Sequence, residues 1–246
     1  MCEINLSIVF KEKSYKVVDN KLDLSYYGAG LIEEIEDLEQ LEGLSSLITL
    51  KRPKLSDNNI LKITNLDNLK NLRSLWLNNN SIHRISGLDS LKNLEVLILN
   101  NNNITEISGL EHLNKLKSLH LGVNNIGEIK GLNNLINLEK LYLSGNRINK
   151  IKGLESLTKL RILDLQHNRI EALEGLDNLT NLSILRIWGN KIKTRKGLEN
   201  LPQLEIIDDD HIKPTLYCAF CGIQLESGEL CKSCEEKKKN FYKKYS

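Results

Sequence analysis

The chain has 246 residues, of which 40% are hydrophobic and 27% are charged, and its formal net charge at pH 7 is +2. This composition supplies enough apolar residues for a buried core, and the near balance of charge argues against a strongly basic nucleic-acid-coating protein or an acidic tail protein. No segment approaches the roughly 20 consecutive apolar residues that a membrane-spanning helix requires, so we expect no membrane segment.

The N-terminal residues 1–21 are expected to form a cap, either a short strand or a hairpin. They lack the basic start and the small-residue cleavage site of a signal peptide, so we expect them to belong to the mature protein. The sequence KLDLS at Lys21–Ser25 predicts the first strand of the next region. Acidic residues between Glu33 and Glu42 are expected to form a solvated face of a degraded first repeat.

A leucine pattern then returns every 22 residues. Leucine or isoleucine holds one position, at Leu77, Leu99, Leu121, Leu143, Leu165 and Ile187. Asparagine holds another, at Asn80, Asn102, Asn124, Asn146, Asn168 and Asn190. Because so short a unit buries its apolar side chains only by stacking on its neighbours, the pattern predicts a solenoid over residues 22–212. We expect the asparagines to satisfy backbone groups at a turn, and the glycines that recur from Gly87 to Gly197 to occupy positions of positive φ or close packing.

The repeat reads LxxLxxLxLxxNxIxxIxGL, and the frame ends on LPQLEIID at residues 201–208. This pattern resembles the 22-residue class of leucine-rich repeats that is typified by the regulatory subunit of type-1 protein phosphatase. The resemblance implies an α/β solenoid, a horseshoe with a parallel sheet on its concave side. Since 22 residues are too few for a full convex helix, we expect 3₁₀ turns on the convex side. A role in phosphatase regulation is a narrower implication of the same resemblance.

Alternation along each strand directs Leu75 and Leu77 inward and Ser74 and Trp76 outward. The outward side chains include both tryptophans and form a face more apolar than an ordinary surface, and Trp, Tyr and Arg dominate interface energetics. We therefore predict that this concave face binds a protein partner; the alternative is that its rings only pack on one another. The candidate partner-binding residues are Trp76, Val96, Ile98, His120, Tyr142, Ile162, Asp164, Ile184, Arg186 and Trp188.

The sequence predicts no catalytic site. His120 and Asp164 lie two strands apart, about 10 Å, which is too far for a hydrogen bond. No Ser or Cys is paired with a base in a known motif, and the chain contains no phosphate-binding loop or HExxH sequence. We expect no enzymatic activity and no small-molecule substrate.

Two CxxC pairs, CAFC and CKSC, follow the repeats in residues 213–236. Four thiolates can close a tetrahedron around zinc and leave no open position, so we predict one structural zinc ion. The predicted ligands are Cys218, Cys221, Cys231 and Cys234. The segment resembles zinc-ribbon modules, with Gly222 after the first pair but Glu235 where a second glycine is usual. Disulfides, a redox pair and an iron–sulfur cluster are the alternatives. This cysteine usage favours a cytoplasmic location, or a nuclear one in a eukaryote.

Residues 237–246 form a basic tail in which lysines alternate with Phe241, Tyr242 and Tyr245. The tail is expected to be solvated. The sequence as a whole predicts a non-enzymatic adaptor or regulatory subunit whose concave face binds a protein, with the zinc ribbon as a second interaction module. The alternative is a nucleic-acid-associated protein that binds through the ribbon and the tail.

Overall fold

The structure is a computed structural model that describes residues 7–25, 35–193, 196–198 and 201–205, and the backbone of strands at 206–208, 216–217 and 224–225. The chain divides into two units, Met1–Ile207 and Asp208–Ser246, and each is described by itself. Among the described residues, no helix is long and apolar enough to cross a membrane.

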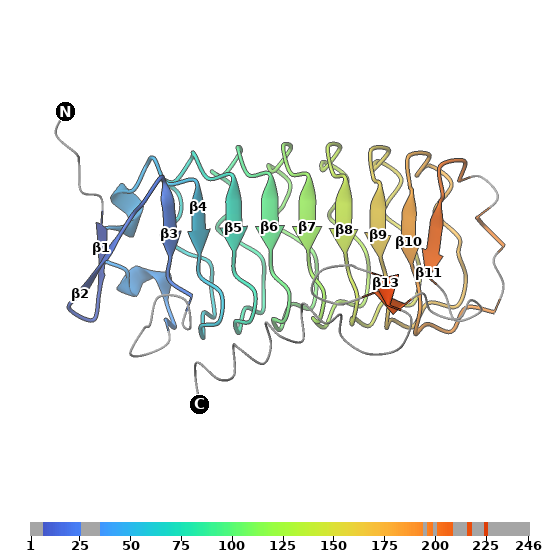
Figure 1. The fold of residues 1–246 in the computed structure, drawn as a ribbon, viewed down its shortest axis with the longest axis horizontal. Helices are drawn as coiled ribbons and strands as arrows, with labels where there is room; N and C mark the ends of the chain where they lie inside the picture. The colour runs from blue at the N-terminus through green and yellow to red at the C-terminus, as the bar shows by residue number, and fades with distance from the viewer. Residues whose placement is uncertain are drawn as a thin grey trace. The chain divides into compact units, whose positions relative to one another are not determined.

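The first unit is built on a nine-stranded sheet in which neighbours along the chain are neighbours in space (Figure 1). The strands pair in parallel, as the repeat pattern predicts, and from β4 onward each begins 22 residues after the one before it. They are β3 (Lys21–Asp23), β4 (Arg52–Lys54), β5 (Ser74–Trp76), β6 (Val96–Ile98), β7 (Ser118–His120), β8 (Lys140–Tyr142), β9 (Ile162–Asp164), β10 (Ile184–Arg186) and β11 (Ile206–Asp208). The strand expected at KLDLS is thus the end strand β3.

A hairpin precedes the sheet, and it is one of the two forms that the sequence predicts for this segment. Its antiparallel strands are β1 (Ser7–Phe10) and β2 (Lys13–Lys16). Val9 bridges to Glu42, so the hairpin is joined to the first turns of the solenoid. Ile8 and Phe10 are buried against the end of the leucine core, which shields that end from water.

The 3₁₀ turns that the sequence predicts take two forms. The described part of the chain contains two short 3₁₀ helices, η1 (Leu38–Gln40) and η2 (Leu44–Ser46). In the later repeats the equivalent segments are single turns, such as the one that the Leu91 amide closes on the Leu88 carbonyl at 2.9 Å. Isolated turns suffice there because the leucines on either side are held by packing rather than by a continuous helix.

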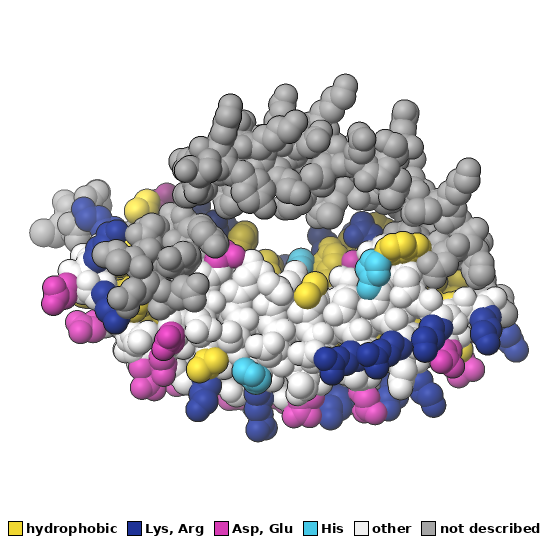
Figure 2. All heavy atoms as spheres, turned by 90° about the horizontal axis from the view of Figure 1, so that it is seen from below, with side chains coloured by type: hydrophobic (Ala, Val, Ile, Leu, Met, Phe, Trp, Pro, Cys, Tyr) yellow, Lys and Arg dark blue, Asp and Glu magenta, His cyan; other side chains and the backbone are white. Residues whose placement is uncertain are grey.

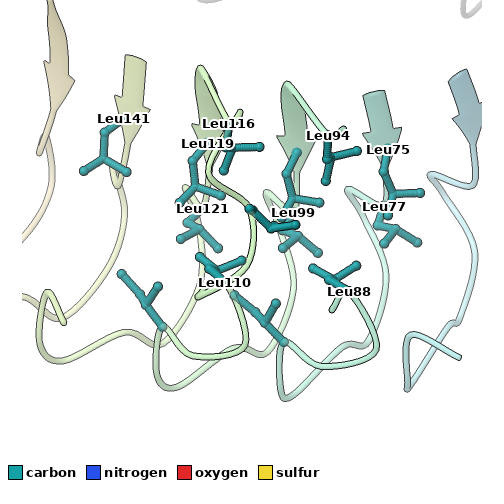
Figure 3. Packing of buried hydrophobic residues seen from close by; sticks show 14 of the residues in the cluster. Leu75, Leu77, Leu88, Leu94, Leu99, Leu110, Leu116, Leu119, Leu121 and Leu141 are labelled. Carbon is teal, nitrogen blue, oxygen red and sulfur yellow. The ribbon is translucent and has the colours of Figure 1, made fainter. Parts of the chain in front are cut away.

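The core of the first unit is a stack of leucine and isoleucine side chains behind the sheet (Figure 3). Leu75 and Leu77 are fully buried, as are their equivalents Leu97, Leu99 and Leu119 in the following repeats. Each leucine packs on the same leucine of the next repeat, so the core is continuous although every strand is only three residues long. This arrangement leaves the opposite face of the sheet free of core side chains.

The asparagine column lies beneath the strand ends and is buried from Asn80 to Asn168, as expected, while Asn190 is half-buried. In a typical repeat, Asn124 Nδ2 donates hydrogen bonds to the carbonyl oxygens of Leu99 at 3.0 Å, Leu121 at 3.1 Å and Gly122 at 3.2 Å. Its Oδ1 accepts a hydrogen bond from the Ile104 amide at 3.0 Å. One side chain therefore satisfies backbone groups in two successive repeats.

The second unit contributes one described element, an antiparallel pair of short strands. These are β12 (Leu216–Tyr217) and β13 (Gln224–Leu225), with Leu216 opposite Leu225 and Tyr217 opposite Gln224. The four cysteines predicted to bind zinc lie outside the described residues.

Candidate functional site

The face of the sheet opposite the leucine core carries the candidate site. We call it the strand face and define it by the first and third residues of strands β4 to β10, which project away from the core. Parallel pairing aligns these residues in rows across the strands. The row of third residues is Lys54, Trp76, Ile98, His120, Tyr142, Asp164 and Arg186, and the row of first residues is Arg52, Ser74, Val96, Ser118, Lys140, Ile162 and Ile184.

The strand face brings the candidate partner-binding residues together, apart from one. Those on β5 to β10 are half-buried, except Asp164, which is buried. Trp188 lies outside the strands, in the turn that follows β10, where its side chain is 37% exposed. Its ring and the His167 ring form a T-shaped pair, with centroids 4.4 Å apart and an interplanar angle of 87°. The partly exposed rings and aliphatic groups form a continuous apolar line across β5 to β8.

Trp76 is held by a polar group of its own strand and by a cation of the neighbouring strand β4. Its Nε1 donates a hydrogen bond to Ser74 Oγ at 2.7 Å, from the same strand and the same face. The Lys54 ammonium lies 4.8 Å from the centroid of the tryptophan ring, in the geometry of a cation–π contact, and 3.5 Å from an oxygen of Asp23. These contacts fix the ring in place on a surface that stays partly open to solvent.

The centre of the strand face is a stacked pair of rings. His120 and Tyr142 lie on neighbouring strands with centroids 4.4 Å apart and planes at 22°. Ser118 Oγ is 2.8 Å from His120 Nε2, a contact that the sequence analysis missed. Its signal is the spacing of two residues, which places both side chains on one face of a strand.

Burial lowers the pKa of His120 from 6.5 to about 4, and the nearby Lys140 ammonium acts in the same direction. At pH 7 the ring is therefore neutral and a weak base. A serine beside a histidine has two of the groups of a nucleophile–base pair, but such a base works best with a pKa near the operating pH. We interpret Ser118 as a group that orients the ring.

The lowered pKa of His120 makes a pH-dependent contribution to stability. Because the folded-state pKa lies below the unfolded value, the unfolded chain binds the proton first as the pH falls, and stability is lost between about pH 6.5 and pH 4. We expect His120→Phe to remove up to about 3 kcal/mol of this loss, as measured by urea unfolding at pH 7 and pH 4. The matched control is His83→Gln, an exposed histidine. An unchanged pH dependence in His120→Phe would contradict the assignment.

Asp164 and Arg186 lie opposite one another on β9 and β10 and form an ion pair. Arg186 Nη1 is 3.9 Å from Asp164 Oδ2, and Asp164 Oδ1 also accepts a hydrogen bond from the Gln166 amide at 3.1 Å. Burial raises the pKa of Tyr142, Arg186 opposes that rise and Asp164 adds to it.

Charged residues line the edge of the sheet where the strands begin. Glu95, just before β6, pairs with Arg73 and with Lys117, whose Nζ is 3.1 Å from Glu95 Oε2. The hydrogen bond from Lys117 lowers the pKa of Glu95, burial opposes that shift, and Arg73 adds to it. The negative charge of Glu95 at this edge is therefore neutralised by its two basic partners.

A second set of charges lies away from the strands. Figure 2 looks onto the turns that follow the strands and shows basic side chains gathered in a row there. Equivalent positions of three successive repeats hold Arg147, Arg169 and Lys191, all of them exposed. None of the three makes an ion pair with another described residue. Within the described ranges, no group of three or more His, Cys, Asp or Glu side chains is arranged to hold a metal ion.

Comparisons with known proteins agree with this architecture. A family model described as leucine-rich repeat matches residues 1–123, and one described as leucine-rich repeats (2 copies) matches residues 136–178. No curated protein gave a significant sequence match.

Three solved structures illustrate the similarity. An internalin (InlF) from Listeria monocytogenes is 29% identical, with a TM-score of 0.61, and the match covers 72% of this chain and 58% of that one. Internalin C2 from the same organism is 29% identical, with a TM-score of 0.68 and coverage of 77% and 80%. A leucine-rich repeat protein of Leptospira interrogans is 32% identical, with a TM-score of 0.62 and coverage of 66% and 44%. The chain thus spans less than two thirds of InlF and of the Leptospira protein.

Proposed function

The chain belongs to the leucine-rich repeat family, and from this premise we propose that it is a non-enzymatic adaptor or regulatory subunit that binds a protein partner on the strand face. Members of this family commonly mediate protein–protein interactions. Solenoids of this kind present one long surface whose residues are free of the demands of the core. The partner is expected to contact several strands at once.

The observation that carries the proposal is the apolar line across β5 to β8. Trp76, Ile98, His120 and Tyr142 stand side by side in register, and all four remain partly exposed. Aromatic side chains that are rigid and partly exposed dominate the energetics of interfaces. The charged pair Asp164–Arg186 at the end of this line supplies polar selectivity beside the apolar contacts.

The proposal is tested by affinity capture from an extract of the native cell. We expect Trp76→Ala combined with Trp188→Ala to lower the recovery of the bound protein by roughly tenfold or more. The matched control combines Ile48→Ala with Ile136→Ala. These side chains are 57% and 54% exposed, but they lie in turns that connect the strands and are not part of the strand face. Equal recovery by both double variants, at equal thermal stability, would contradict the proposal.

The same capture experiment tests two further hypotheses, a role in phosphatase regulation and an association with nucleic acid. A phosphatase catalytic subunit among the bound proteins would support the regulatory role that the 22-residue repeat class implies. If nuclease treatment released the bound material, the nucleic-acid-associated alternative, through the four-cysteine segment and the lysine-rich tail, would replace the proposal. We expect recovery to be insensitive to nuclease.

A separate proposal concerns the second unit, where we place one structural zinc ion on Cys218, Cys221, Cys231 and Cys234. The support is the two CxxC pairs, together with the position of the first pair in the sequence between the paired strands β12 and β13. Zinc would supply folding energy to a segment too short to form a core. Since thiolate ligands suit a reducing compartment, we also propose a cytoplasmic location.

Metal analysis of the purified, reduced protein tests the zinc site. We expect about one zinc per chain, and loss of the metal in Cys218→Ser combined with Cys231→Ser. Cys2→Ser is the matched control, because Cys2 stands outside both pairs, and it should retain the metal. A metal content near zero in the unsubstituted protein would remove the zinc site.

A further inference from the structure

A hollow of about 660 Å³ lies at one end of the strand face. Strands β3, β4, β5 and β6 contribute to it, and its apolar lining includes Trp76 and Val96. A volume of this size falls within the range of ligand-binding pockets in proteins. Of its lining residues, only Leu22 belongs to the leucine core, so packing of the core does not account for the hollow.

The acidic groups of the hollow already have basic partners. Asp23 pairs with Lys54 at 3.5 Å, and the same Lys54 ammonium lies over the ring of Trp76. Glu95 pairs with Arg73. The lining therefore contains two carboxylates, and each is matched by a cation.

Two further cations in the lining have no such match within the part of the chain that the structure describes. Lys21 and Arg52 are directly opposite one another in the parallel register of β3 and β4, and both are exposed. No hydrogen bond or ion pair joins either side chain to another described residue. Like charges directly opposite one another across two strands are destabilising, and a carboxylate placed between them would relieve that repulsion. Among the described residues, nothing compensates these two positive charges, which lie in the same hollow as the Trp76 ring.

We propose that this hollow binds an acidic peptide segment of the protein partner, with carboxylates at Lys21 and Arg52 and an apolar side chain against Trp76 and Val96. This inference rests on the proposed function and names the chemistry of the partner. Asp23 and Glu95 border the hollow, and they disfavour a nucleic acid strand because its charges repeat at every phosphate. A peptide, in contrast, can carry carboxylates at the positions that face the cations and uncharged residues at the positions that face Asp23 and Glu95.

The occupancy of the hollow can be followed with a single fluorophore. The chain has two tryptophans, so Trp188→Phe leaves Trp76 as the only one. In this background we titrate the full chain with the blocked peptide Gly-Glu-Asp-Leu-Asp-Glu-Gly. We expect a saturable change in Trp76 fluorescence that weakens as salt is added, and no change with the peptide in which lysine replaces every acidic residue.

A pair of charge-matched variants separates a specific site from general attraction. Lys21→Gln with Arg52→Gln is expected to weaken binding of the acidic peptide by about tenfold, since both carboxylate contacts are lost. Arg147→Gln with Arg169→Gln removes the same charge from the turns that follow the strands and should leave the affinity unchanged. Loss of the response in neither variant, or in both equally, would overturn the inference, as would the absence of any saturable response.

Two comparisons complete the test. A single-stranded oligonucleotide that binds more tightly than the peptide, and is equally sensitive to the Lys21 and Arg52 substitutions, would assign the hollow to nucleic acid and overturn the inference. Partner capture distinguishes this failure from failure of the proposed function. If capture depends on Trp76 and Trp188 but the peptide does not bind, the strand face still binds a partner and only the acidic-peptide site is wrong.

Discussion

Replacing Gly131 with alanine is expected to lower the free energy of unfolding by about 2–4 kcal/mol. The backbone at Gly131 has φ +72°, a left-handed conformation that costs alanine roughly 1 kcal/mol. A Cβ at this position would also lie 2.5 Å from the carbonyl oxygen of Ile107, in the preceding repeat. Because the backbone fixes the position of the Cβ and the oxygen belongs to the main chain, no side-chain rotation relieves the clash and the two repeats must move apart. The measurement is the free energy of unfolding by urea, followed by circular dichroism.

Gly127 in the same repeat provides the matched control. An added Cβ there meets no atom within 4 Å, and its φ is not in the left-handed region. Gly127→Ala should therefore change the stability by no more than about 0.5 kcal/mol, with a gain expected if it changes at all. Equal losses in the two variants would show that the cost comes from glycine replacement in general, and that close packing between repeats is not its cause.

Asn124→Ala is the second substitution with a large expected effect, a loss of about 2–4 kcal/mol in the free energy of unfolding. The asparagine amide makes three donated hydrogen bonds and one accepted hydrogen bond, all to buried backbone groups. Alanine would leave the buried Ile104 amide without a partner, and an unsatisfied buried group costs about 1–3 kcal/mol. The three carbonyl oxygens would each lose one donor but keep another, from Asn102 Nδ2, Asn146 Nδ2 and the Asn101 amide, so each of these losses costs less. The partial relaxation of the turn accounts for an expected total below the simple sum.

The neighbouring Asn125 is the control for this prediction. It is half-exposed, and only its backbone amide is hydrogen-bonded, to the Ile104 carbonyl at 2.8 Å. Asn125→Ala should change stability by less than about 0.5 kcal/mol in the same urea unfolding measurement. If Asn124→Ala were no more costly than Asn125→Ala, the asparagine column would not be a structural element of the solenoid.

The solenoid fold could be predicted from the sequence because every repeat has the same pattern of leucine, asparagine and glycine positions. The spacing of Leu75 and Leu77 assigns one face of each strand to the core, and the asparagine and glycine columns mark the turns between strands. The parallel order of β4 to β11 follows, since a repeat of constant length places each strand beside its predecessor. The strand-face positions of Trp76 and Tyr142 then follow from alternation alone.

Other features depend on neighbours that the repeat pattern leaves unspecified. The pairing of Lys21 with Arg52 across β3 and β4 involves a connection longer than one repeat, so the 22-residue spacing does not predict it. The charge state of His120 depends on how deeply Tyr142 and Ser118 bury its ring. The extent of burial of Asp164 was also not predictable, because alternation indicates a direction for a side chain and not the packing around it.

The sequence predicts the fold better than it predicts the function, because the repeat pattern is made of scaffold residues and not of surface residues. Residues such as Gly131 and Asn124 are fixed by contacts between repeats and are shared in kind by any solenoid of this spacing. Trp76, Lys21 and Arg52 occupy outward positions where packing between repeats does not restrict the type of side chain. The solenoid sets the positions of these residues, and their chemical types indicate what this chain binds.

The most direct test of the central claim is the ratio of partner recovered by the two double variants in the capture experiment. Trp76→Ala with Trp188→Ala removes rings of the candidate site, and Ile48→Ala with Ile136→Ala removes apolar side chains that are more exposed but lie elsewhere. If the strand face binds the partner, recovery by the tryptophan variant falls roughly tenfold below recovery by the isoleucine variant. A ratio near one, with both variants folded, would contradict the account.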